Sequence, residues 1–169
     1  RIGFIKTLKS MGGNIKIIKK RKLHNEFIAD LKIEQKKNLK PTTLQPSEVP
    51  LQIDEIPILS IAAAFANGLT VFKGLKELTV KESNRLLMIY ENLKKIGVKS
   101  EIKNFDLYIY GNYNLKEGAA IIKHENDHRI LMSFFISNMI CKNNNIIKDK
   151  SCVKTSYPLF FKHISRFIT

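Results

Sequence analysis

Apolar side chains along this chain recur with the periods of an α-helix and of a β-strand. The clearest helix lies between residues 78 and 97, where apolar positions share one face: Leu86, Ile89, Tyr90, Leu93 and Ile96. Gly97 ends that helix. Further helices are predicted over residues 3–12, 57–66 and 127–139 and after Pro158, and strands over 14–19, 27–35, 69–74, 98–103, 106–111 and 145–149. The pattern therefore predicts a mixed α/β fold.

Two parts of the chain resemble each other. FIKTLKSMGGNIKI at residues 4–17 matches IYENLKKIGVKSEI at residues 89–102, and another predicted strand follows each. FFKHISRFI at residues 160–168 resembles the start of a third copy. This repeat indicates several similar α/β units packed around a shared core. Between the first two copies, the proline-rich segment at residues 36–50 is predicted to be a loop.

The start of the helix after residue 78 carries more charge than capping requires. Thr79 and Glu82 have the spacing of a capping box, in which each side chain satisfies a backbone N–H. Capping does not explain Lys81 and Arg85, because exposed cations at a helix N-terminus cost roughly 0.3–1 kcal/mol each. An anion that docks there makes the same cations favourable.

Other helix starts carry similar charged side chains. Arg129 lies in the first turn of its predicted helix, and Lys154 lies just before the start signals of the last one. Asp54 precedes Pro57, where ordinary helix capping is the competing explanation. Because three helix starts carry Lys or Arg, the sequence predicts that they converge on one anion site.

The net charge of +14 over 169 residues invites a nucleic-acid interpretation. KIIKKRKLH at residues 16–24 is the kind of cluster that contacts phosphates. It lacks interleaved aromatic residues for base stacking, and Lys, Ile and Asn are all abundant, as AT-rich coding produces. We therefore interpret it as a solvated strand end or turn and predict no nucleic-acid partner. The positive field also favours small anionic substrates.

The remaining composition bears on location and completeness. Cys141 and Cys152 cannot form a disulfide framework and fit a reducing compartment. The most apolar run, IPILSIAAAFA, is about half as long as a membrane span, and no signal-peptide pattern is present. We expect a soluble, cytoplasmic protein with no membrane contact. Since the chain begins at Arg1 on a helical pattern, we also expect it to be the C-terminal part of a longer chain.

HENDH at residues 124–128 offers a competing interpretation of this stretch, namely that the chain is a zinc hydrolase. It matches His-Glu-x-x-His, in which two histidines one helical turn apart bind zinc and the glutamate acts as base. The match requires a helix from His124 to His128. Asn126 or Asp127 is instead expected to cap a helix, which leaves His124 in a solvated loop. The other histidines are distant in sequence: His24 and His163.

Four motifs, in this order and at these separations, resemble one known family: IDEIPILSIAAAFANG, LTVKESNR, NDHRILMSF and TSYPLFF. They resemble the C-terminal part of the 3-phosphoshikimate 1-carboxyvinyltransferase, or EPSP synthase, family over essentially all of residues 1–169. The resemblance implies an enolpyruvyl transferase fold of repeated βαβαββ units, an inside-out α/β domain with helices inside and sheets outside. It also implies that the family's N-terminal domain is absent from this chain.

The resemblance implies a reaction without metal or organic cofactor. The carboxyvinyl group of phosphoenolpyruvate is transferred to the 5-hydroxyl of shikimate 3-phosphate, and phosphate is released, on the route to chorismate and aromatic amino acids. The whole enzyme is expected to act as a monomer. The missing N-terminal domain is expected to supply most of the groups that hold shikimate 3-phosphate.

The motif positions that match the family carry the following implied roles. Asp54 is the base at the 5-hydroxyl, and Glu82 is the general acid and base at the methylene carbon. The role of Glu82 requires its burial, which favours a protonated carboxyl. Lys81 lies between the two substrates. The remaining side chains bind phosphoenolpyruvate or phosphate: Arg85, Arg129 and Lys154.

The sequence departs from the family pattern at two places. Asn84 stands where the family usually has aspartate, which removes a possible partner of Arg85. Counting back from Pro158 places Thr155, rather than Lys154, where some members carry the phosphate-binding lysine. Two further alternatives stay open: a related enolpyruvyl transferase that acts on a nucleotide sugar, and a non-catalytic domain of the same fold that binds a partner.

Overall fold

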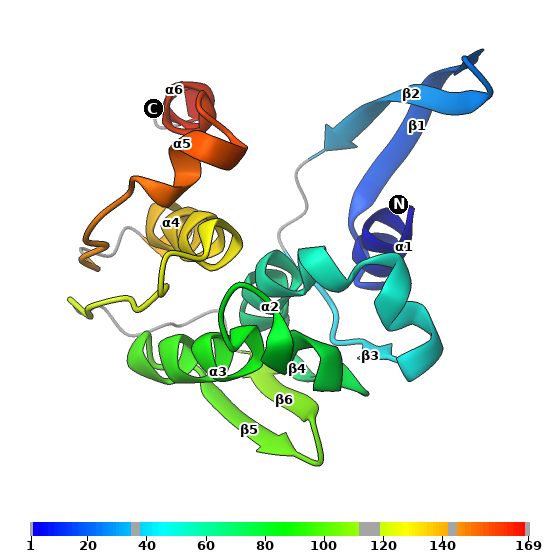
Figure 1. Cartoon of the computed structure of the whole chain (residues 1–169). Helices are drawn as coiled ribbons and strands as arrows, with labels where there is room; N and C mark the ends of the chain where they lie inside the picture. Colours follow the sequence, from blue (N-terminus) through cyan, green and yellow to red (C-terminus); the bar gives the residue numbers. More distant parts are fainter. Residues whose placement is uncertain (1, 35–37, 112–118, 142–144, 168–169) are drawn as a thin grey trace.

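The computed structural model describes residues 2–34, 38–111, 119–141 and 145–167 (Figure 1). Residue 35 of one predicted strand, residues 36–37 of the predicted loop and residue 168 of the third copy lie outside the described residues. The described helices are α1 (Gly3–Ser10), α2 (Ile56–Ala64), α3 (Arg85–Lys95), α4 (His128–Cys141), α5 (Cys152–Ser156) and α6 (Phe160–Ile164). The strands are β1 (Asn14–Leu23), β2 (Glu26–Glu34), β3 (Thr43–Leu44), β4 (Gly68–Phe72), β5 (Lys99–Lys103) and β6 (Asp106–Gly111).

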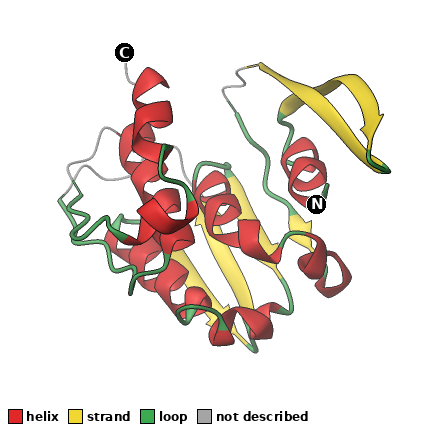
Figure 2. Cartoon of the chain, turned by 45° about the horizontal axis from the view of Figure 1, so that its top comes forward, coloured by secondary structure: helices red, strands yellow, loops and turns green. Residues whose placement is uncertain are grey.

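The centre of the molecule is one βαβαββ unit that spans residues 43–111. Its strands form a four-stranded sheet in the order β3-β4-β6-β5. The short β3 is parallel to β4, and α2 connects them, while β6 is antiparallel to both β4 and β5. Helix α3 connects β4 to β5, and both helices lie against the sheet (Figure 2). This unit is the one that the resemblance implies.

Parts of two further units flank the central one. Helix α1 and the antiparallel β1–β2 hairpin repeat the order of α3, β5 and β6, so the predicted repeat is confirmed in its elements. After the central unit, a parallel bridge joins Ile121 to Ile146 on either side of α4, and α6 follows.

The predicted strand at residues 145–149 is wrong, because the pairing within the described ranges consists of a single bridge, at Ile146. Side chains replace the rest of the strand pairing. The Asn145 side chain accepts the Ala120 N–H at 2.8 Å, and Asn138 Nδ2 donates to the Asn145 carbonyl at 2.9 Å.

Helix α2 is the centre of the core. Seven of its residues are buried and apolar side chains surround its axis, as is typical of a helix enclosed on all sides. It packs against β6 on one side and α4 on the other. On the opposite face of the sheet, Tyr108 and Tyr110 lie under the ammonium groups of Lys103 and Lys99. Helices inside and strands outside match the expected arrangement.

The predicted loop at residues 36–50 is partly wrong. Its described part contains β3 and a 3₁₀ helix at Pro46–Leu51. A capping box explains the helix, because the Gln45 N–H donates to Glu48 Oε2 at 2.9 Å, and Pro46 sits at the first helical position, where no N–H is needed. Pro46 therefore starts a helix rather than prevents one.

The β1–β2 hairpin extends away from the rest of the molecule (Figure 1). Its first strand is exposed at every residue except Ile15. The basic cluster at residues 16–24 therefore lies on an exposed part of β1 and the turn that follows it. Among the described residues, none of the helices combines the length and apolar character needed to cross a bilayer.

Candidate active site

The starts of three helices meet at one place. Asp54 lies in the 3₁₀ turn Ile53–Glu55 that leads into α2, Arg85 is the first residue of α3, and Arg129 is the second residue of α4. All three side chains belong to one network of ion pairs. Residues separated by up to 75 positions are thus in direct contact. Of the three basic helix starts predicted to converge, those of Arg85 and Arg129 do so through Asp54.

Arg85 is the centre of the network. Its side chain is completely buried, and it donates to three carboxylates: Asp127 Oδ2 from Nε at 2.7 Å, Asp54 Oδ1 from Nη1 at 3.1 Å, and Glu82 from Nη2. Burial opposes the charged guanidinium, but hydrogen bonding to Asp127 and the nearby charges outweigh it and raise the pKa of Arg85. The predicted cation at this helix start is therefore already compensated by the protein's own carboxylates.

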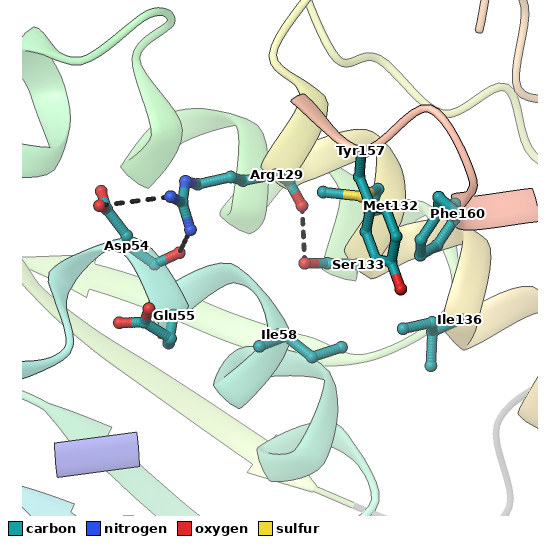
Figure 3. A pocket seen from close by; sticks show the side chains of 9 residues that line it. All are labelled: Asp54, Glu55, Ile58, Arg129, Met132, Ser133, Ile136, Tyr157 and Phe160. Carbon is teal, nitrogen blue, oxygen red and sulfur yellow. Dashed lines mark hydrogen bonds and ion pairs between the residues drawn. The ribbon is translucent and has the colours of Figure 1, made fainter. Parts of the chain in front are cut away.

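Asp54 joins the two arginines. Besides the bond to Arg85, its Oδ2 lies 3.4 Å from Arg129 Nη2, and its carbonyl accepts from Arg129 Nη1 at 3.3 Å (Figure 3). Ordinary capping does not explain Asp54, since the residue at the N-cap of α2 is Glu55, whose side chain makes no capping bond. Asp54 is instead placed where its carboxylate faces two cations.

A pocket of about 210 Å³ opens beside this network. Asp54, Glu55 and Arg129 form its polar end, and its other walls come from α2, α4 and the segment after α5: Ile58, Met132, Ser133, Ile136, Tyr157 and Phe160 (Figure 3). Its volume is below the roughly 300–1,000 Å³ of pockets for drug-sized ligands. The pocket therefore fits a small ligand, and its polar end offers one arginine and two carboxylates.

The capping box at Thr79 and Glu82 is wrong. Helix α3 starts at Arg85, and Asn84 caps it by accepting the Leu87 N–H at 3.0 Å. Thr79 lies in a 3₁₀ helix, Leu75–Val80, where its hydroxyl donates to the Lys76 carbonyl. The helix starts later than predicted because the side-chain oxygen of Asn84 accepts the backbone N–H of Leu87, which has no partner within the helix. Asn84 thus caps the backbone of α3, and the carboxylates that pair with Arg85 belong to other residues.

Glu82 and Lys81 precede α3 in a bend. The predicted role of Glu82 requires a buried carboxyl. In the chain as described its side chain is 53% exposed, so this burial is not observed. The Glu82 carboxylate does not cap a helix. It pairs with the guanidinium of Arg85, which carries a full positive charge. Lys81 Nζ donates to Glu77 Oε1 at 2.5 Å, and its side chain remains 24% exposed.

Lys154 is not brought into the network. It lies in α5, a helix that the sequence did not predict, and its side chain is exposed. Thr155 is exposed as well, and its hydroxyl donates to the Cys152 carbonyl at 3.0 Å. From this segment the pocket receives Tyr157 and Phe160.

The helix that the zinc motif needs is not formed. Helix α4 begins at His128, while Glu125 and Asn126 have left-handed backbone angles, with φ of 47° and 60°. His124 lies in the loop, as predicted, but it is buried rather than solvated, with its Nε2 2.8 Å from the Lys148 carbonyl. Within the described ranges, His, Cys, Asp and Glu side chains form no cluster of three that could hold a metal ion.

Sequence reasoning missed the role of Asp127, which it treated only as a cap. Asp127 does cap α4, because its Oδ1 accepts the Arg129 and Ile130 N–H groups at 2.9 and 3.3 Å. Its Oδ2 also accepts from Arg85 and from the Ser83 hydroxyl. The only signal in the sequence was the presence of Ser83 and Asp127 inside the two motifs that carry the arginines.

With this geometry described, comparison with known proteins identifies the family. The family model described as EPSP synthase (3-phosphoshikimate 1-carboxyvinyltransferase) matches residues 1–164. The chain belongs to the EPSP synthase family. The 3-phosphoshikimate 1-carboxyvinyltransferase of Aquifex aeolicus is 42% identical over 168 residues, which are 99% of this chain and 38% of the relative. The enzyme of the same name from a Sulfurihydrogenibium species is 40% identical over 166 residues.

Solved structures agree with the EPSP synthase assignment. An EPSP synthase structure from Acinetobacter baumannii superposes with a TM-score of 0.85 at 34% identity and covers 98% of this chain and 38% of that one. The enolpyruvyl transferase NikO from Streptomyces tendae, at 12% identity and a TM-score of 0.65, shares the fold. The chain thus spans about two-fifths of the length of the EPSP synthases that it matches.

Proposed function

We propose that this chain supplies the phosphoenolpyruvate half of the active site of a 3-phosphoshikimate 1-carboxyvinyltransferase. The reaction transfers the carboxyvinyl group of phosphoenolpyruvate to the 5-hydroxyl of shikimate 3-phosphate and releases phosphate. One observation carries the proposal: Asp54, Arg85 and Arg129, each in a motif shared with the family, form one network at the end of a small pocket. Phosphoenolpyruvate is small enough for this pocket, and its carboxylate and phosphate are partners that an arginine such as Arg129 can bind.

In the proposed mechanism, the two arginines bind phosphoenolpyruvate. Their planar groups match a carboxylate or phosphate with two parallel hydrogen bonds. Asp54 now occupies both of them, so the ligand exchanges with this carboxylate at Arg85 and Arg129. Once displaced, Asp54 is available to accept the proton of the attacking 5-hydroxyl.

Glu82 and Lys81 carry the proton transfer at phosphoenolpyruvate. Glu82 delivers a proton to the methylene carbon and later removes one, while Lys81 lies between the two substrates. The burial that favours the acid form of Glu82 is provided in the proposal by the second half of the site, since this carboxyl faces solvent in the chain itself. Lys154 adds a phosphate contact.

The rest of the enzyme belongs to the proposal as well. We place residues 1–169 in the C-terminal part of an enolpyruvyl transferase domain, with an N-terminal domain that holds shikimate 3-phosphate. The whole protein is proposed to be a cytoplasmic monomer. The presence of Cys141 and Cys152 as free thiols fits a reducing compartment.

The decisive experiment mixes this chain with the separately expressed N-terminal part of the Aquifex aeolicus relative and follows phosphate release. We expect release only from the mixture and only when both substrates are present, because proximity of the two substrates supplies much of the rate. Release by this chain alone would contradict the shared site. A mixture that binds both substrates and releases no phosphate would contradict the proposed reaction.

A further inference from the structure

The three carboxylates around Arg85 are not equivalent. Asp54 and Glu82 have side chains that are 22% and 53% exposed, and both bind the Nη atoms. Asp127 is completely buried and binds Nε on the other edge of the guanidinium. A ligand can replace partners that reach solvent, but it cannot replace a buried carboxylate without leaving a buried charge unpaired.

Asp127 also connects two helix starts. Its Oδ2 accepts from Arg85 Nε at 2.7 Å and from Ser83 Oγ at 3.1 Å, both at the start of α3. Its Oδ1 accepts from the Arg129 N–H at 2.9 Å at the start of α4. One rigid carboxylate therefore sets the positions of both arginines relative to each other.

We infer that Asp127 is a positioning residue for the anionic substrate: it anchors Arg85 through Nε and leaves the Nη edge for the ligand, while it fixes Arg129 through the cap of α4. The inference rests on the proposed function, because it takes phosphoenolpyruvate as the ligand. Asp54 and Glu82 are then exchangeable partners of Arg85, whereas Asp127 is the permanent one. Ser83 orients Asp127 by donating to the same oxygen that receives Arg85.

The test uses Asp127→Asn. Asparagine is a good helix cap and nearly the same size, so one amide oxygen can still accept from the start of α4. The amide nitrogen then faces Arg85 and Ser83, which are both donors, and the anchor is lost. Asn84→Ala is the matched control, because it removes the cap of α3 and does not contact the guanidinium of Arg85.

Two measurements are made on the chain of residues 1–169. The first is hydrogen exchange of the Arg85 Nε–H by NMR, which reports the anchor directly. The second is the affinity for phosphoenolpyruvate and inorganic phosphate by titration. We expect Asp127→Asn to speed the exchange and to weaken phosphoenolpyruvate binding by roughly tenfold or more each, as for loss of a charged hydrogen bond. Asn84→Ala should change both by less than about threefold, since it costs only helix stability.

Several outcomes separate the inference from the proposed function. Unchanged exchange and affinity in Asp127→Asn overturn the inference and leave the function intact, as does an equal change in Asn84→Ala. A wild-type chain with a protected Nε–H that binds neither probe overturns the proposed function, and with it any role of the anchor in substrate binding. If Asp127→Asn does not fold, Ser83→Ala replaces it. Exchange that is roughly 2–10-fold faster then supports the anchor, and unchanged exchange rejects it.

Discussion

At the scale of single residues, several carboxylates of the site bind the same two arginines. Arg85 and Arg129 share the Asp54 carboxylate, and Arg85 also binds Glu82 and Asp127. A buried arginine is stable only when it is paired, so the protein supplies its own anions wherever a ligand is absent. The proposed catalytic carboxylates, Asp54 and Glu82, are thus held by the cations that are proposed to bind the substrate.

The role of Glu82 can be tested by Glu82→Gln in the mixture with the N-terminal part. We expect turnover to fall at least about 10²-fold, because a proton-transfer group is removed, while substrate binding stays within about tenfold. Glu91→Gln is the control, since Glu91 pairs with Lys123 on the surface, outside the network. Steady-state phosphate release measures both. Near-normal turnover in Glu82→Gln would reduce Glu82 to a partner of Arg85.

Arg129→Ala separates the two substrates. Arg129 lines the pocket, and its loss removes a charge-assisted bond to one ligand, so the KM for phosphoenolpyruvate should rise far more than the KM for shikimate 3-phosphate. Initial rates with each substrate varied in turn give the two constants. Arg166→Ala, an exposed arginine near the C-terminal end, should change neither. Equal effects on both constants would place Arg129 outside the phosphoenolpyruvate subsite.

At the scale of elements, the site depends on how closely α2 lies on β6. Gly111 ends β6, and a Cβ added there would lie 2.0 Å from the Ala66 carbonyl oxygen and 2.3 Å from that of Ala63. Both oxygens belong to the backbone, in the last turn of α2 and just after it, so a side-chain rotation cannot move them. Glycine at this position therefore lets the central helix, which follows the turn that carries Asp54, pack closely on the sheet.

Gly111→Ala should lower the free energy of unfolding by about 3 kcal/mol, since overpacking against backbone has no cheap relief. Ser100→Ala, on the neighbouring strand, is the control. The buried Ser100 hydroxyl has no hydrogen-bond partner in the part of the chain that is described, so its removal should change stability by less than about 1 kcal/mol. Urea denaturation of the two variants measures the difference. Equal stabilities would mean that α2 can shift freely along the sheet.

At the scale of the whole molecule, one apolar surface stands uncovered. The face of the β1–β2 hairpin that looks toward α1 contains Ile17, Phe27 and Leu31, which line a second pocket of about 290 Å³ with Ile2 and Ile5. Phe27 and Ile33 are 70% and 69% exposed. Monomeric soluble proteins rarely expose contiguous apolar surface of this kind.

We therefore expect residues 1–169 alone to self-associate with rising concentration. The double variant Phe27→Ser and Ile33→Ser should shift the chain toward the monomer, because the apolar area available for contact falls. Analytical ultracentrifugation over a concentration series measures the shift. Phe167→Ser removes an equally exposed phenyl group outside the hairpin and should have little effect. A wild-type chain that stays monomeric would show that the exposed hairpin face does not cause self-association.

Most of the elements, the repeat and the family could be predicted from the sequence. Helix and strand periods are local, so they predicted α3, the hairpins and the order of the central unit from α2 onward, whereas β3 lay in the predicted loop. The motifs located Asp54, Arg85 and Arg129. Charge at the helix starts also predicted that Arg85 and Arg129 converge, but it wrongly included Lys154. The capping box at Thr79 failed because several local caps compete within a few residues, and the choice among them depends on what Glu82 meets in space.

Only the tertiary structure decided which charges are paired. Asp127 lies 42 residues from Arg85 and Asp54 lies 31 residues from it, so no periodicity connects them. Burial of the guanidinium makes these partners necessary, because an unpaired charge in the interior is far more costly than one on the surface. The exposure of Glu82 to solvent could not be predicted from the sequence either. It depends on which segments of the folded chain cover the bend that contains Glu82.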